Sequence, residues 1–148
     1  MKIMHEKGFT LVELLITMLV FAVLASMAAP GFSRMKSTQD LNKSARELTL
    51  LLNDARAKAA FERRSVEVVL NPVSNAADTN TQLNWRATGE AVLLSSSPNK
   101  IKFLPSGLVD SNTDLTFRVC NKLGGSISRQ VTVSRMGTLQ LIKEGDCT

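Results

Sequence analysis

The chain has 148 residues and a formal net charge of +5, which leaves room for one folded domain and one membrane anchor. It contains one histidine (His5), two cysteines and no tyrosine, which disfavours a histidine-based metal site, a thiolate cage and an aromatic base-stacking platform. The modest positive balance favours anionic neighbours such as lipid headgroups, nucleic acid or acidic protein faces, without choosing among them.

An apolar run follows a short polar leader. Residues 9–29 carry a single charge, Glu13, and as a helix they would cover about 31 Å, the thickness of a bilayer's hydrocarbon core. Lys2 and Lys7 precede the run, and cationic flanks tend to stay in the cytoplasm. We therefore predict a transmembrane segment with the rest of the chain outside the cytoplasm. Cleavage as a conventional signal peptide, near Ala25–Ala28, is the alternative.

Glu13 is the unusual residue of this run. A carboxylate inside a spanning helix costs about 2.5–3.5 kcal/mol on insertion scales. One interpretation is an ordinary anchor that tolerates an acid near one end. The other is that a cut after Gly8 frees an α-amino group at Phe9, and that Glu13 pairs with such an amine.

Pro30 and Gly31 interrupt the apolar run. Because Pro30 lacks the backbone donor of a helix interior, we predict a kink there, with a simple helix stop as the alternative. Beyond it, apolar side chains recur every three or four residues, which indicates one face of an amphipathic helix over residues 30–62. The expected buried face comprises Leu41, Ala45, Leu48, Leu52, Ala55 and Ala59.

Residues 63–148 change to a period of two, which is typical of half-buried strands. We predict an α+β fold in which one long helix, from about residue 9 to 62, packs on an antiparallel sheet. The expected strands are 66–70, 83–88, 91–94, 101–104, 115–119, 131–133 and a last one at Leu139 and Leu141.

Cys120 and Cys147 are the two cysteines. In a chain exported beyond the cytoplasm, an even pair is more economically a disulfide than a redox or metal site. Closing a loop of that length would stabilise the fold by about 3–4 kcal/mol in the chain-entropy model.

The segment Gly8–Leu14 closely resembles the processing site of type IV prepilins and type II secretion pseudopilins. The resemblance implies that residues 1–8 are a leader peptide, which a prepilin peptidase removes by cutting after Gly8. It further implies methylation of the new N-terminus at Phe9 and a role for Glu13 in assembly into a helical filament. Many type IV pilins also carry a proline at the position of Pro30, with the helix continuing past it.

The rest of the chain resembles the GspH/FimT type of minor pilins and pseudopilins. This implies a single-pass inner-membrane protein with a periplasmic C-terminal domain, which is surrounded by lipid before it assembles with other pilin or pseudopilin subunits. The Cys120–Cys147 pair would tie a sheet strand to the C-terminus, as is common in pilins. The matching segments are Leu52–Ala60, Ile101–Gly107, Leu115–Cys120 and Val131–Gly137.

Some members of this group bind DNA through a Gly-Arg-x-Arg motif near the C-terminus. The corresponding segment here is Gly137–Gln140, in which the glycine is present and both arginines are missing. If Arg129, Arg135 and Lys143 project from one face, they could hold phosphates weakly. A solvated sheet face is the alternative, and we favour it.

No catalytic constellation, cofactor motif or metal-ligand spacing is found in the sequence. We therefore predict a non-enzymatic minor pilin or pseudopilin without a cofactor, either incorporated in a type IV pilus or type II secretion pseudopilus or priming one. The alternatives are a DNA-binding minor pilin for natural transformation and a monomeric, membrane-anchored periplasmic binding domain. The last of these leaves the Gly8–Glu13 segment unexplained.

Overall fold

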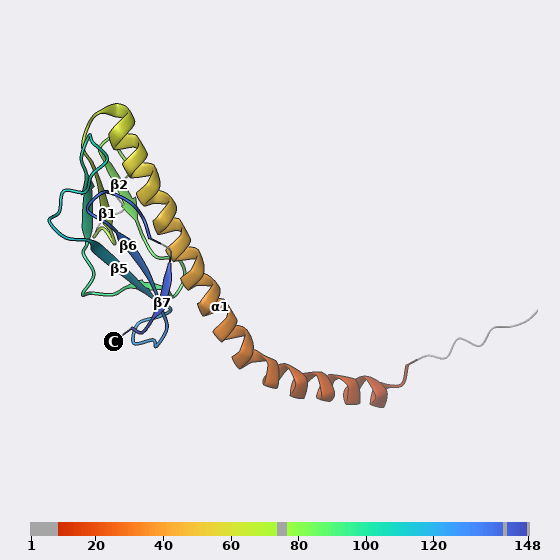
Figure 1. The fold of residues 1–148 in the computed structure, drawn as a ribbon. Coiled ribbons are helices and arrows are strands. Elements are labelled where there is room, and N and C mark those ends of the chain that lie inside the picture. Colours follow the sequence, from red (N-terminus) through yellow and green to blue (C-terminus); the bar gives the residue numbers. More distant parts are fainter. Residues whose placement is uncertain (1–8, 74–76, 141, 148) are drawn as a thin grey trace, which may run out of the picture. The chain divides into compact units, whose positions relative to one another are not determined.

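The structure is a computed structural model that describes residues 9–73, 77–140 and 142–147, without the side chains of residues 28–30. It divides into two compact units, Met1–Lys36 and Ser37–Thr148. Figure 1 shows one long helix, α1 (Leu11–Glu62), followed by the strands. In the described part of the chain these are β1 (Val66–Leu70), β2 (Gln82–Trp85), β3 (Val92–Leu93), β4 (Lys100–Phe103), β5 (Leu115–Cys120), β6 (Ser128–Val133) and β7 (Lys143–Gly145).

Helix α1 has a defined signal at each end. Thr10 precedes it, and the Thr10 Oγ1 atom accepts a hydrogen bond of 3.2 Å from the Glu13 amide, as an N-cap does. At the other end Arg63 adopts a left-handed conformation (φ 51°), and the Arg64 amide donates to the Ala59 carbonyl at 3.3 Å. This six-to-one bond is that of a Schellman motif. The predicted helix of about 9–62 is confirmed.

In the N-terminal unit, every described side chain from Phe9 to Met27 is exposed. No single helix in the described residues has the length and composition to cross a membrane, whereas Leu11–Met27 and Gly31–Glu62, bent relative to each other, could do so as a pair. The helix assignment runs through Pro30. Because the side chains there lie outside the description, the kink at Pro30 remains a prediction.

The C-terminal unit contains two sheets that lie on one side of the C-terminal half of α1 (Figure 1). The first has the strand order β2-β1-β4 and the second β3-β5-β6-β7. Pairing is antiparallel except between β1 and β2, which are parallel, with Val68 opposite Leu83. The predicted α+β class is confirmed, but the division into two sheets and the parallel pair were not predicted.

The core lies between these sheets and α1. All six helix residues predicted to form the buried face are at most 1% exposed. Alternate residues of the strands meet them, including Val66, Val68, Phe117 and Val131. Trp85, the one tryptophan, is 4% exposed and belongs to the same core.

The last predicted strand, at Leu139 and Leu141, is not found as a strand in the described residues. Leu139 forms only an isolated bridge to Val133, and Leu141 lies outside the described residues. On the side of β6 away from β5, the paired strand is β7, with Gln130 opposite Lys143. The residues of β7 are Lys-Glu-Gly, and such an edge strand buries no apolar face that a period of two could reveal.

Candidate functional site

The N-terminal segment around Phe9 and Glu13 is the first candidate site. Phe9 is 80% exposed, and the Glu13 carboxylate forms no hydrogen bond or ion pair with another described residue. The three hydroxyl side chains of residues 9–27 all bond within the segment. Thr10 Oγ1 accepts from the Glu13 amide, Thr17 Oγ1 donates to the Leu14 carbonyl at 2.9 Å, and Ser26 Oγ donates to the Val23 carbonyl at 2.7 Å. Glu13 is thus the polar side chain of the run that is left without a partner. Gly8 lies outside the described residues.

The sequence also contains a helix-start signal that was not predicted. Thr10 and Glu13 have the spacing of a capping box, in which a threonine cap is followed three residues later by a glutamate. The structure contains the half of the box in which the Glu13 amide donates to Thr10. The helix can therefore begin directly after the predicted new N-terminus.

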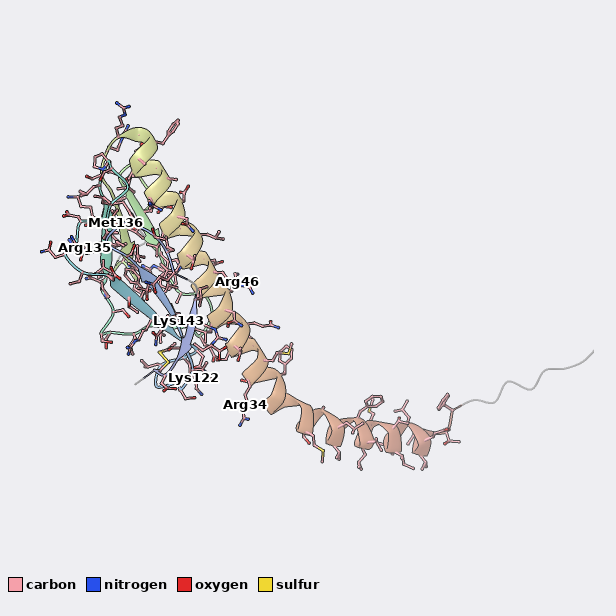
Figure 2. All side chains as sticks on the ribbon, viewed as in Figure 1. Arg34, Arg46, Lys122, Arg135, Met136 and Lys143 are labelled. Atoms are coloured by element: carbon pink, nitrogen blue, oxygen red, sulfur yellow. A yellow bond between two sulfur atoms is a disulfide. The ribbon has the colours of Figure 1, made fainter. Side chains whose placement is uncertain are left out.

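The second candidate site, the cations Arg129, Arg135 and Lys143, is not assembled on one face. Arg129 is opposite Glu144 and Lys143 is opposite Gln130, so Arg129 and Lys143 project from opposite faces of the sheet. Arg135 follows β6, five residues beyond Gln130, or about 17 Å along the strand direction. Figure 2 shows Arg135 beside Met136, apart from Lys143.

Arg129 is moreover occupied within the domain. Its Nη2 lies 2.8 Å from Glu144 Oε1, and its Nε donates to Asn42 Oδ1 on α1 at 3.0 Å. The Arg129 side chain is only 15% exposed, so a phosphate would have to displace both partners. This arginine joins the sheet to the helix.

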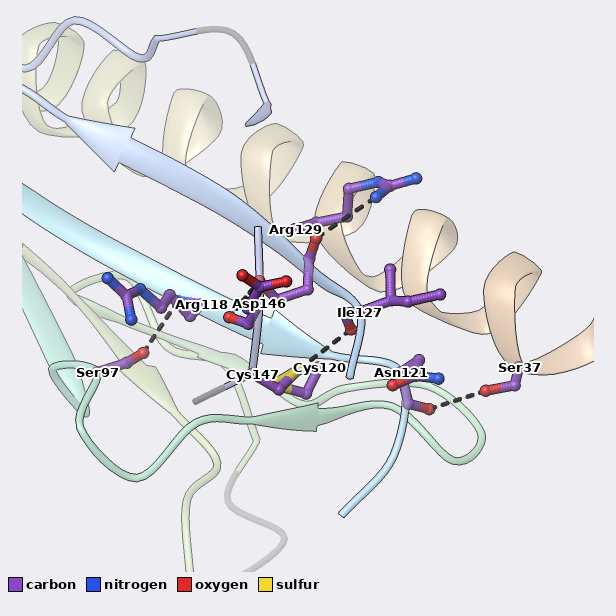
Figure 3. Close-up of a disulfide and its surroundings, with 10 residues drawn as sticks. Ser37, Ser97, Arg118, Cys120, Asn121, Ile127, Arg129, Asp146 and Cys147 are labelled. Atoms are coloured by element: carbon purple, nitrogen blue, oxygen red, sulfur yellow. Dashed lines mark hydrogen bonds between the residues drawn. A yellow bond between two sulfur atoms is a disulfide. The ribbon is translucent and has the colours of Figure 1, made fainter. Parts of the chain in front are cut away.

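The predicted disulfide is present and joins Cys120, the last residue of β5, to Cys147, with the Cα atoms 5.8 Å apart. Figure 3 shows it beside the loop that connects β5 and β6. The Ser128 hydroxyl of β6 donates to the Asp146 carbonyl at 2.9 Å, which links a second strand to the C-terminal segment. The chain end is thereby fixed to the second sheet.

Two similar turns lie against α1 near its C-terminal end. Gly107 and Gly137 both have left-handed φ angles, of 77° and 75°, and their amides donate to the Leu104 and Ser134 carbonyls, both at 2.8 Å. Arg56 of α1 bridges the turns: its Nε donates to the Gly107 carbonyl and its Nη2 to the Met136 carbonyl, both at 3.2 Å. The role of Arg56 was not predicted, because its partners are backbone atoms distant in sequence.

An open cleft of about 440 Å³ lies beside these turns. Its lining is mainly apolar and includes Leu104, Leu108 and Met136, together with Arg135 and Asp114. Among the described residues, no group of three or more histidine, cysteine, aspartate or glutamate side chains could hold a metal ion. The cleft therefore offers an apolar surface with two charged side chains in its lining.

Known proteins show similarity to both parts of the chain. The family described as "Prokaryotic N-terminal methylation motif" matches residues 3–29, and the family described as "Type II transport protein GspH" matches residues 44–137. Two curated relatives, each named "Fimbrial protein" of Pseudomonas aeruginosa, are 27% identical over 135 residues, which is 88% of this chain and 79% of theirs.

Two crystal structures of the type IV minor pilin FimU of Pseudomonas aeruginosa (strain PAO1) share the fold. Their TM-scores are 0.56 and 0.52, at 21% and 22% sequence identity. The similar regions cover 77% and 73% of this chain and 99% and 100% of those chains. The GspH match covers more than half of the chain and follows a methylation motif. The chain therefore belongs to the GspH family, and it is a type IV pilin-like structural subunit of the minor pilin or pseudopilin kind.

Proposed function

We propose that residues 9–29 anchor this subunit in the inner membrane as a single pass, with the C-terminal domain in the periplasm. The subunit then leaves the membrane and joins a type IV pilus or a type II secretion pseudopilus. The observation that carries this proposal is the exposed apolar surface of the helix from Phe9 to Met27. Such a surface needs lipid or neighbouring helices around it. The same segment serves both states, first against lipid and then against other subunits.

Glu13 supports the second of these states. In lipid its carboxylate is unfavourable by about 2.5–3.5 kcal/mol, and its own helix offers it no partner among the described residues. A free α-amino group at Phe9 of an adjacent subunit would supply the missing cation. Leader removal after Gly8 by a prepilin peptidase, with methylation of Phe9, would create that amine.

Intact mass spectrometry of the membrane-extracted protein tests the processing step. We expect the loss of residues 1–8 and the gain of one methyl group. A retained Met1, or a new N-terminus near Ala28, would contradict the proposal, because neither leaves an amine at Phe9.

Replacement of Glu13 tests the assembly step. We expect Glu13→Ala to insert and fold normally but to be depleted from filaments or tip complexes that also contain wild-type partner subunits. Thr17→Ala is the matched control, since it removes a polar group from the same segment that is already bonded within its helix. If Glu13→Ala and Thr17→Ala are incorporated equally well, Glu13 has no pairing role in this subunit.

Neither alternative function has an observation of its own in its favour. Capture of DNA would need cations on one face, whereas Arg129 and Lys143 project from opposite faces. A monomeric binding domain could use the cleft at Leu104 and Met136, but it gives no reason for the exposed Glu13.

A further inference from the structure

The loop between β5 and β6, residues 121–127, presents an apolar and cationic tip. Leu123 is 88% exposed and Ile127 is 42% exposed. Lys122, next to Leu123, is exposed and takes part in no ion pair among the described residues. Figure 2 shows Lys122 at the end of the C-terminal domain where α1 enters it.

This β5–β6 loop has a fixed base. The Asn121 amide donates to the Ile127 carbonyl and the Gly125 amide to the Lys122 carbonyl, both at 3.0 Å. The disulfide bond of Cys120 adjoins the first residue of the loop, and Cys147 Sγ lies 3.1 Å from the Ile127 carbonyl oxygen (Figure 3). A loop that is already ordered loses little conformational entropy when its tip binds a surface.

The base is also tied to α1. The Ser37 hydroxyl, which is buried, donates to the Asn121 carbonyl at 3.2 Å (Figure 3). Ser37 follows Ala29, the end of the apolar run, by eight residues, which span at most about 28 Å when fully extended and about 12 Å as helix. The base of the loop is therefore at most about 28 Å, measured along the chain, from the end of the apolar run.

The charges of this part of the chain indicate which surface the loop fits. Lys143 on β7 is a further exposed cation without an ion pair among the described residues, and Asp146 offsets one positive charge. An apolar side chain flanked by cations is the composition that binds at an anionic lipid interface.

We propose that the β5–β6 loop docks on the anionic surface of the membrane that holds the anchor. Leu123 enters the headgroup layer, and Lys122 contacts lipid phosphates. This inference rests on the proposed membrane anchoring and adds a second, reversible membrane contact, which the subunit must release when it leaves the bilayer for a filament. It assigns a function to an exposed leucine that the core does not need.

Lipid quenching on the full chain tests the inference. Leu123→Cys carries the one free thiol, because both native cysteines are bonded, and is labelled with a fluorophore. The protein is reconstituted into vesicles of phosphatidylcholine alone or mixed equally with phosphatidylglycerol, each containing a headgroup nitroxide lipid. We expect strong quenching in the anionic vesicles and weak quenching in the neutral ones. Lys122→Gln should lower the docked-to-free ratio about fivefold, the value of one lysine near an anionic surface.

Ser106→Cys is the matched control position. Ser106 is exposed and lies in the turn whose Gly107 carbonyl accepts from Arg56. Arg56 is 19 residues beyond Ser37, which places it about 28 Å further along α1. Equal quenching at the two positions, or equal quenching of Leu123→Cys in the two kinds of vesicle, overturns the inference. Energy transfer between labelled copies without lipid quenching also overturns it, because the loop would then bind a second subunit.

Flotation of the same vesicles separates the inference from the proposed function. Protein that floats with the vesicles but is not quenched at residue 123 retains its anchor, and only the docking of the loop fails. Protein that does not float lacks the anchor, and both proposals fail together.

Discussion

Arg56 shows how one side chain organises two distant turns. Its guanidinium donates to the Gly107 carbonyl and to the Met136 carbonyl at once. The planar fork of an arginine can reach two acceptors in a fixed geometry, whereas a lysine ammonium acts as a point charge on a flexible stem. The wall of the cleft beside Leu104 and Met136 therefore depends on a residue of α1.

We predict that Arg56→Lys and Arg56→Ala both lower the free energy of unfolding, by about 1–3 kcal/mol, because each breaks the bridge between the turns. Urea unfolding of the full chain in detergent, followed through the fluorescence of the buried Trp85, measures this change. Arg46→Ala, on the exposed side of α1, is the control and should stay within about 0.5 kcal/mol of wild type. A loss at Arg46 as large as that at Arg56 would refute the bridging role.

Gly137 is required for two separate reasons. Its φ of 75° is left-handed, and a Cβ there would collide with the Gly107 carbonyl oxygen and approach Arg56 Nε to 2.8 Å. Gly124 has a similar φ of 67°, but a Cβ there meets nothing within 4 Å. The two glycines thus differ in crowding and not in backbone conformation.

Substituting both glycines separates these effects. Gly124→Ala should cost about 1–2 kcal/mol for the left-handed conformation alone. Gly137→Ala should cost at least about 1–3 kcal/mol more, because the turns and Arg56 must move apart. The same urea experiment measures both variants, and equal losses would mean that the contact between the turns relaxes freely.

The periodicity of apolar residues predicted which face of a helix or strand is buried. The apolar repeat from Leu41 to Ala59 identified the buried face of α1, since burial on one side requires a period near 3.6. The alternation of Val66, Val68 and Leu70 identified β1 in the same way. These features depend on local sequence, so the sequence predicts them.

Pairing partners could not be predicted in this way. The parallel alignment of β1 and β2 is a pairing between two separate segments, which the pattern within each segment does not reveal. β7 is an edge strand whose charged residues do not alternate with apolar ones. Whether the cations share one face could not be predicted for the same reason. Only the register of β6 with β7 places Arg129 and Lys143 on opposite faces.

The disulfide is the covalent support of the second sheet's edge. A bond between Cys120 and Cys147, 27 residues apart, is worth about 3–4 kcal/mol in the chain-entropy model. We predict that the double variant Cys120→Ser/Cys147→Ser loses about this much stability. We further predict faster amide hydrogen exchange at Lys143–Gly145 with little change in β1, because the disulfide supports the edge and not the core. Uniformly faster exchange in both sheets would contradict this local role.

The cationic side chains that give the chain its net charge of +5 lie on different elements, and some of them are bonded within the domain. Arg56 and Arg129 bond within the C-terminal domain. The formal charge therefore overstates what is available to a polyanion. Binding of DNA depends on how many cations can release counterions from one stretch of phosphates.

We predict that the full chain in neutral detergent binds duplex DNA weakly. The logarithm of the binding constant should fall with the logarithm of the salt concentration with a slope near −2. Arg135 and Lys143 remain available to phosphates, whereas Arg129 is held by Glu144 and Asn42. Titration of a fluorescent duplex at several salt concentrations measures the slope. Arg135→Ala should make it shallower by about 1, whereas Arg129→Ala should leave it unchanged. Binding that persists at physiological salt and is lost in Arg129→Ala would contradict this prediction. That result would require Arg129 to leave its ion pair and turn toward DNA, so that DNA capture would become a function of this face of the sheet.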